Sequence, residues 1–234
     1  MEIVAILLLL ICYGLAAYLA WLQRTPLYLL ALGAGHLSAL ALPLWHMLYG
    51  ARLSAGFEQA QQLLAQAIPM GVILGSGWYY PLPAIIVLLL WRTRWWFPGY
   101  LAGFITFFIF SLYHLVLETI GLRTRTWSYE AGLLPWGLTA PLLHAFMAAV
   151  ISYGLLYVLL ATNRFSWQSL LVLVLPAGLG LSLLVHGLLG APFWVALIVG
   201  GPAWMAQVGL FTSLALLLWA SQIITSGFNR LQAP

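Results

Sequence analysis

The sequence predicts an all-α membrane protein, a bundle of seven transmembrane helices in one domain over residues 1–234. Of these residues, 64% are apolar and only 5% are charged, and the charged set consists of Arg and Glu alone. A soluble domain carries about 25% charged residues, so this chain lacks the charge that a water-facing surface needs. The apolar residues also form runs of about 20 or more, the length that a membrane helix requires. The composition excludes a soluble domain, a disordered chain and a nucleic-acid-binding protein.

Short segments with turn-forming residues separate the apolar runs. Charged breaks follow Trp21, Trp91, Gly121 and Ala161, whereas the break at residues 190–192 carries no charge. The polar stretch Ala51–Gln66 is expected to form a short amphipathic helix at the membrane interface. The expected spans are Ile3–Trp21, Leu27–Tyr49, Ala67–Trp91, Gly99–Gly121, Leu133–Ala161, Trp167–Leu189 and Phe193–Thr225.

Arginine placement predicts the orientation of the bundle. One side carries Arg24, Arg92, Arg94, Arg164 and Arg230, and the other carries Arg52, Arg123 and Arg125. Because Arg is more frequent in cytoplasmic loops, we expect the N-terminus outside and the C-terminus inside, in a bacterial cytoplasmic membrane. The Glu residues all fall on the outer side, where we therefore expect the polar chemistry.

Ionisable side chains within membrane helices are costly, so each one is a candidate for function. His114 and Glu118 are four residues apart on the fourth expected span and share one helix face. A carboxylate beside an imidazole can exchange protons with a substrate, so these two are the candidate catalytic residues. The other ionisable residues within the expected spans are His36, His46, His144 and His186.

Histidines on several spans also raise the question of a metal or haem. His36 and His144 are expected near mid-membrane on different helices, and a b-type haem needs two such ligands. His46 and His186 lie nearer the outer helix ends and complete the set of candidate metal ligands. No HExxH or similar spacing supports a metal site. A retinal protein is excluded in its usual form, because its Schiff base needs a Lys and the chain has none.

The segment Glu118–Tyr129 reads ETIGLRTRTWSY. Its Glu-x-x-Gly-x-x-Thr pattern, followed by Trp127 and Tyr129, resembles a motif of bacterial integral-membrane carotenoid hydratases and related isoprenoid-modifying proteins, which have a similar number of helices. The likeness covers about a dozen residues, and Arg125 and Thr126 stand where that family has a Gly-containing turn. The resemblance implies acid-catalysed modification, such as hydration or cyclisation, of a polyene or polyprenyl chain.

Such chemistry needs an acid and an apolar pocket with aromatic walls, because aromatic faces stabilise carbocations. Glu118 with His114 would supply the acid. The expected partners are the bilayer and a long apolar small molecule of the isoprenoid, carotenoid or quinone type. The expected ligand-binding residues are Trp78, Tyr79, Tyr80, Tyr113, Arg123, Trp127, Tyr129 and His144.

Two other functions fit the same sequence. The chain has almost no extramembrane mass, which suits a non-catalytic subunit packed against other subunits of a respiratory or photosynthetic complex, holding a haem, quinone or pigment. A small-molecule transporter is the third reading. It is less favoured because coupled transporters carry acids at the membrane midplane, whereas Glu118 lies near one end of its span.

Overall fold

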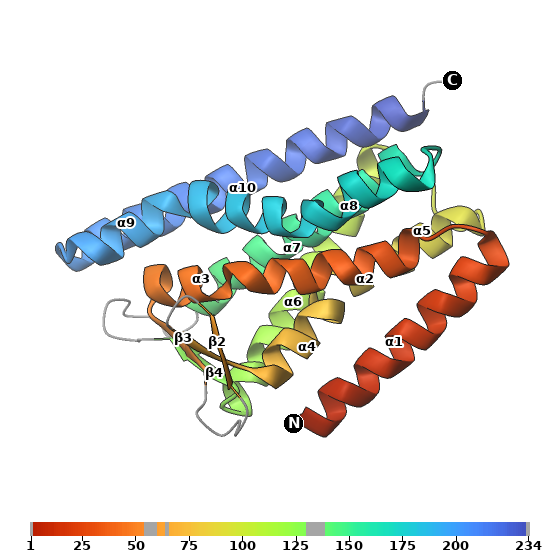
Figure 1. Cartoon of the computed structure of the whole chain (residues 1–234). Coiled ribbons are helices and arrows are strands. Elements are labelled where there is room, and N and C mark those ends of the chain that lie inside the picture. The colour runs from red at the N-terminus through yellow and green to blue at the C-terminus, as the bar shows by residue number, and fades with distance from the viewer. Residues whose placement is uncertain (1, 54–59, 64–65, 130–138, 233–234) are drawn as a thin grey trace.

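The structure is a computed structural model, and it describes residues 2–53, 60–63, 66–129 and 139–232. Its described part is a helical bundle with seven helical segments long and apolar enough to cross a membrane (Figure 1). This confirms the expected multi-pass helical fold. The sides on which the two termini lie, and so the orientation of the bundle, stay a prediction.

The first two spans follow the expected boundaries closely. Helix α1 covers Glu2–Gln23, and the second span consists of α2 (Leu27–Ser38), the 3₁₀ turn η1 (Ala39–Ala41) and α3 (Leu42–Tyr49). The α1 span is only 6% buried, and it packs chiefly on α2 and α4 (Met70–Tyr79) at the edge of the bundle. Gly50, with a φ of 60°, ends α3 in the left-handed conformation that glycine adopts without strain.

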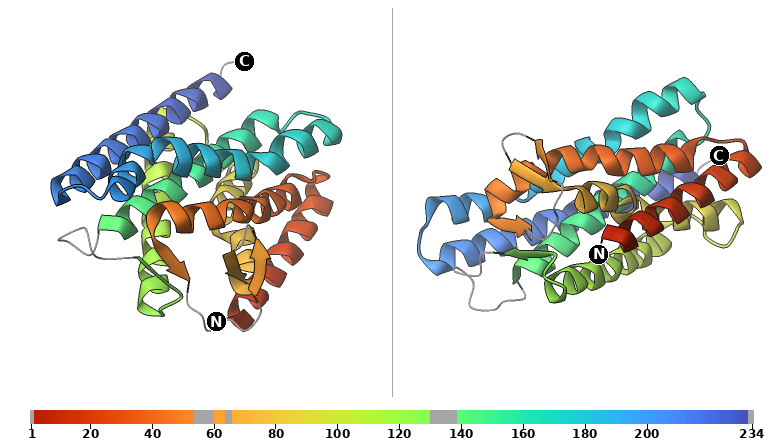
Figure 2. Two further views of the ribbon diagram at one scale, coloured as in Figure 1. Left: turned by 60° about the vertical axis from the view of Figure 1, so that its left-hand side comes forward. Right: turned by 60° about the horizontal axis from the view of Figure 1, so that its bottom comes forward.

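The polar stretch after α3 was expected to be an amphipathic helix, and the structure corrects this. Its described residues form the strands β1 (Ala51–Leu53) and β2 (Ala60–Leu63), followed by β3 (Gln66–Pro69). β2 pairs with β3, and β1 pairs with β4 (Trp127–Tyr129), which follows the fourth span. Both pairs are antiparallel and lie near the end of α3 (Figures 1 and 2). Strand pairing gives the backbone N–H and C=O groups of these segments their hydrogen-bond partners.

The third span begins later than expected and has a break. Residues 67–69 belong to β3, and α4 ends at Tyr79 before α5 (Pro81–Arg92) begins with Pro81 in its first turn. Proline lacks the N–H that a continuous helix would need there, so the chain restarts its helix at this point. The fourth span is the unbroken helix α6 (Tyr100–Arg123).

Helix α7 (Thr139–Thr162) forms the centre of the bundle. Its span is 78% buried, and it packs against α6, α5, α10 (Ala203–Gln232) and α8 (Trp167–Ser182). Figure 2 shows it in green, enclosed by the other helices. The expected start of this span at Leu133 lies outside the described residues.

The sixth span covers Trp167–Leu189 as expected, whereas the seventh begins at Ala203 and not at Phe193. Helix α8 continues into a π-helix, η3 (Leu183–Leu189), and then into α9 (Ala191–Val199). The chain reverses at Gly200–Pro202, so that α9 packs on α10 (Figure 1). A turn at Gly190 ends the sixth span as expected, but the chain does not reverse there. Pro192 sits in the first turn of α9, where proline is tolerated, so a further helix precedes the reversal. Gly200 has a φ of 64° and provides the left-handed residue that the reversal needs.

Candidate functional site

Glu118 is a buried carboxylate near the end of α6, with 5% of its surface exposed. It accepts three hydrogen bonds, all from aromatic side chains. The Tyr79 hydroxyl donates to Oε1 over 3.0 Å. The Trp127 indole N–H and the Tyr129 hydroxyl donate to Oε2 over 3.0 and 2.8 Å. The structure thus brings together four residues that the sequence had singled out, from α4, α6 and β4.

The turn after α6 folds Trp127 and Tyr129 back toward Glu118. It is closed by backbone hydrogen bonds from Thr126 N–H to the Gly121 carbonyl and from Arg125 N–H to the Leu122 carbonyl, at 2.9 and 3.1 Å. Arg125 has a φ of 55°, the left-handed conformation that glycine adopts most easily.

Strand pairing then aims the two aromatic side chains. In the β1–β4 ladder Ser128 lies opposite Arg52, so Trp127 and Tyr129 project from one face of β4. A Cβ at Gly121 would overlap the Trp127 ring, so only glycine lets the indole lie this close to α6. These features explain why a short segment just beyond a membrane helix can cap the carboxylate within it.

Burial raises the pKa of Tyr129 well above its usual value, and the nearby Glu118 carboxylate raises it further. An ionised phenol beside a carboxylate would place two negative charges together in a poorly hydrated site. Tyr129 is therefore a protonated hydrogen-bond donor at physiological pH.

His114 lies on the same face of α6, one turn before Glu118, and is fully buried. Its Nε2 is 2.7 Å from the Ser152 hydroxyl of α7, and its Nδ1 has no hydrogen-bond partner among the described residues. No hydrogen bond joins His114 to Glu118 in the described part of the chain. Tyr79 connects them instead, because it donates to Glu118 and its ring lies 4.9 Å from the His114 ring.

The remaining expected lining residues divide into two groups. Tyr80 packs edge-on against Tyr79, with ring centroids 4.8 Å apart, and the Tyr113 ring lies 4.9 Å from His114. The buried polar atoms of Trp78 and Tyr113 have no hydrogen-bond partner among the described residues. Arg123, in contrast, is exposed at the end of α6 and does not join the cluster. Glu130 lies outside the described residues.

A second aromatic cluster adjoins the first through Tyr129. The Tyr129 ring stacks on His144 at 4.7 Å with an interplanar angle of 14°, and the His144 and His186 rings are 6.2 Å apart. Trp45 stacks on His186 at 4.7 Å, and the Tyr49 hydroxyl donates to the His186 carbonyl over 2.6 Å. Sequence reasoning did not identify Trp45 and Tyr49, since their role depends on contacts between α3 and the π-helix η3.

The candidate haem and metal ligands do not all converge. His36 Nδ1–H donates a hydrogen bond to the Ile73 carbonyl over 3.0 Å and its ring stacks on Tyr13, whereas His144 contacts Tyr49, Tyr129 and His186. The side chain of His46 lies outside the described residues. Among the residues that the structure describes, no three His, Cys, Asp or Glu side chains are grouped to hold a metal ion. The haem pairing of His36 with His144 stays a prediction.

Comparisons with known protein families, with curated proteins and with solved structures found no match for this chain.

Proposed function

We propose that this protein binds a long apolar ligand of the isoprenoid, carotenoid or quinone type beside Glu118, and that Glu118 exchanges a proton with it. The observation that carries the proposal is the set of aromatic donors around a carboxylate buried in a membrane helix. A buried carboxylate is costly within a membrane, and such residues mark functional sites by default.

The two oxygens of Glu118 differ in their surroundings. Oε2 accepts from both Trp127 and Tyr129, and an indole N–H can only donate. Oε1 accepts from Tyr79 alone, so it is the oxygen that has room for a proton. Tyr79 can follow a change in protonation because its hydroxyl both donates and accepts. Glu118 Oε1 is thus the atom from which we expect proton transfer.

The chemistry that fits is protonation of an alkene. The Glu118 O–H bond breaks as a C–H bond forms, and the positive charge remains on the neighbouring carbon. Water or a second alkene of the same chain then adds to that carbon, and a proton returns to the carboxylate. The rings of Tyr79, Tyr80 and Trp127 suit such a reaction, since aromatic faces attract cations.

We infer that the ligand enters the bundle from the lipid, since Glu118 itself lies on the buried face of α6. Side chains on the outer face of α6 are exposed along its length, among them Phe108, Leu112 and Val116. A long polyene or polyprenyl chain partitions into the hydrocarbon region and does not need a water-filled entrance.

The test compares Glu118→Gln with Tyr100→Phe in cells that express the protein. Gln keeps the size of Glu but cannot deliver the proton, whereas Tyr100→Phe removes an exposed hydroxyl at the opposite end of α6. We expect only Glu118→Gln to return the isoprenoid profile, measured by chromatography and mass spectrometry, to that of cells without the protein. An unchanged profile in a folded Glu118→Gln protein would contradict the proton-transfer step.

A further inference from the structure

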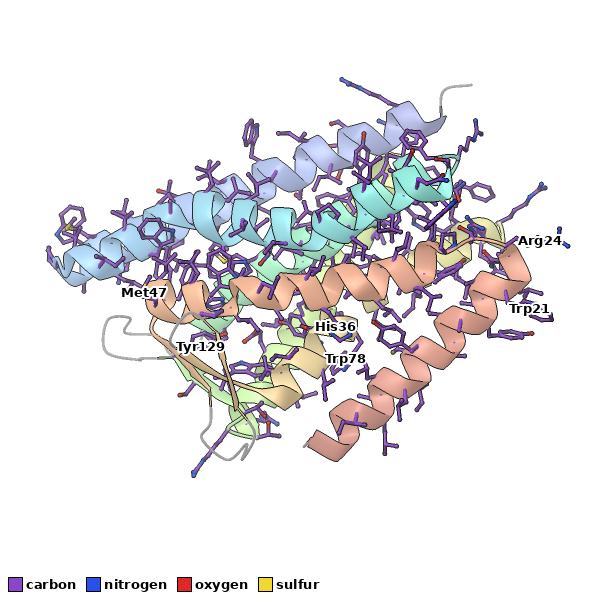
Figure 3. All side chains as sticks on the ribbon, in the orientation of Figure 1. Trp21, Arg24, His36, Met47, Trp78 and Tyr129 are labelled. Atoms are coloured by element: carbon purple, nitrogen blue, oxygen red, sulfur yellow. The ribbon has the colours of Figure 1, made fainter. Side chains whose placement is uncertain are left out.

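A cavity of about 650 Å³ lies at the end of the bundle opposite the Glu118 cluster. Three connections meet there, namely those between α1 and α2, between α5 and α6, and between α7 and α8. In Figure 3, Arg24 and Tyr129 mark these two opposite ends. The polar side chains that line the cavity include Gln23, Arg24, Arg92, Arg94 and Asn163.

Arg92 is held in place by neutral groups. Its guanidinium donates one hydrogen bond to Gln23 Oε1 over 3.0 Å and another to Asn163 Oδ1. Its carbon Cζ lies 6.0 Å from the centre of the Tyr28 ring, and the Tyr28 hydroxyl donates to the same Gln23 oxygen over 2.6 Å. The Arg92 Nε is buried without a hydrogen-bond partner among the described residues. The guanidinium is thus oriented, while its charge is left without an acidic partner there.

Arg24 and Arg94 occupy equivalent positions just after the ends of α1 and α5. Both have positive φ, at 50° and 62°, in turns closed by hydrogen bonds from Thr25 N–H to Ala20 and from Trp95 N–H to Leu90. Glycine is the residue that suits this conformation, and any other side chain is strained in it. A cationic side chain is nevertheless present at both positions, and both residues line the cavity.

The cavity has no counter-charge of its own among the described side chains. Glu118 is the only acidic residue whose side chain is described, and it lies near the other end of α6. Aromatic residues also border the cavity, including Trp91 and Trp167, a type that is enriched at membrane–water interfaces. Three arginine residues line this one open cavity, and guanidinium groups match an anion with several oxygens.

We propose that this cavity binds a phosphate-type anion, either the headgroup of an anionic phospholipid or a free phosphate, through Arg24, Arg92 and Arg94. The site is independent of the proposed chemistry at Glu118. Arginines that only set the orientation of the helices in the membrane would not need to line one cavity. They would also not need a guanidinium group that two amide side chains hold in place.

The test uses Arg24→Gly and Arg94→Gly, singly and together, in the purified full chain. Glycine fits the positive φ at both positions, so the charge is removed without backbone strain. Arg125→Gly is the matched control, because Arg125 has a φ of 55° after α6 and does not line the cavity. Native mass spectrometry measures binding of dioleoyl-phosphatidylglycerol against dioleoyl-phosphatidylcholine. Thermal unfolding at constant ionic strength measures binding of inorganic phosphate.

We expect the parent protein and Arg125→Gly to prefer phosphatidylglycerol. Each single cavity variant should bind it about fivefold more weakly and the double variant about 25-fold more weakly, the changes that correspond to about 1 kcal/mol per arginine. Inorganic phosphate could also raise the unfolding temperature of the parent protein and of Arg125→Gly but not of the cavity variants. That result would identify a free phosphate as the ligand. The proposal is overturned if the cavity variants bind both anions as the parent does, or if the parent binds neither.

Discussion

Gly121 illustrates how one missing side chain shapes the candidate site. It lies one turn beyond Glu118 on α6, and the Trp127 ring covers the place where a Cβ would be. Trp127 can donate to the carboxylate only from this position. This close approach gives the glycine at position 121 a steric reason.

Gly121→Ala should therefore displace Trp127 and destabilise the protein. Forcing a methyl group into a packed site costs about 1–3 kcal/mol, so the thermal unfolding temperature in detergent should fall. Gly180→Ala is the matched control, because a Cβ there meets nothing within 4 Å and alanine favours a helix. Equal unfolding temperatures for Gly121→Ala and the parent would contradict the packing of Trp127 on α6.

Tyr129 predicts a dependence of stability on alkaline pH. Its pKa is raised by burial and by Glu118 in the folded state, and returns to about 10 when the chain unfolds. The folded protein thus holds this proton more tightly, so the stabilisation is fully present below about pH 10 and declines as the pH rises further. Above pH 10 the unfolding temperature of the parent should fall more steeply than that of Tyr129→Phe. Parallel slopes would show that Tyr129 ionises as readily in the folded state.

At the scale of elements, length and apolar content were sufficient to predict the seven spans, and local pattern was not sufficient to place every turn. The strand β1 exists because β4, more than 70 residues later, pairs with it. No periodicity within Ala51–Gln66 reports such a partner. Likewise, Pro192 looks like a helix break in sequence, but it is compatible with the first turn of α9.

The position of the last reversal can be tested with cysteine labelling. The only native cysteine is Cys12, so Cys12→Ser provides a background without thiols. In this background we expect a membrane-impermeant maleimide to label Ala203→Cys, which is exposed next to the reversal at Gly200–Pro202, much faster than Ala191→Cys. Faster labelling of Ala191→Cys would contradict this position and would place the chain reversal at residues 190–192.

In the candidate site too, residues close together in sequence were easier to predict than contacts between different helices. Trp127 and Tyr129 follow Glu118 closely in sequence and were expected to line a pocket beside it, but their hydrogen bonds to its carboxylate were not predicted. The partners of His114 and His186 were not predictable, because Ser152 and Trp45 reach them across contacts between helices. A single sequence does not specify which membrane helices are neighbours.

At the scale of the whole molecule, two polar regions lie at opposite ends of the bundle. The cavity of Arg24, Arg92 and Arg94 lies at the end that the arginine count assigns to the cytoplasm, and the Glu118 cluster at the other. A reporter that works only in the cytoplasm should be active when it is fused to the C-terminus, and a reporter that works only outside should be silent there. A reporter active only on the outer side would reverse the orientation of both regions.

The central claim is that an apolar ligand lies against the aromatic residues that hold Glu118. The most direct measurement is mass spectrometry of an organic extract of the purified protein, compared with Gly121→Ala and with the control Gly180→Ala. We predict a polyene, polyprenyl or quinone compound in the parent and in Gly180→Ala, and its depletion in Gly121→Ala. An extract that contains phospholipids alone from the parent protein, or an equal amount of the apolar compound from all three, would contradict the claim.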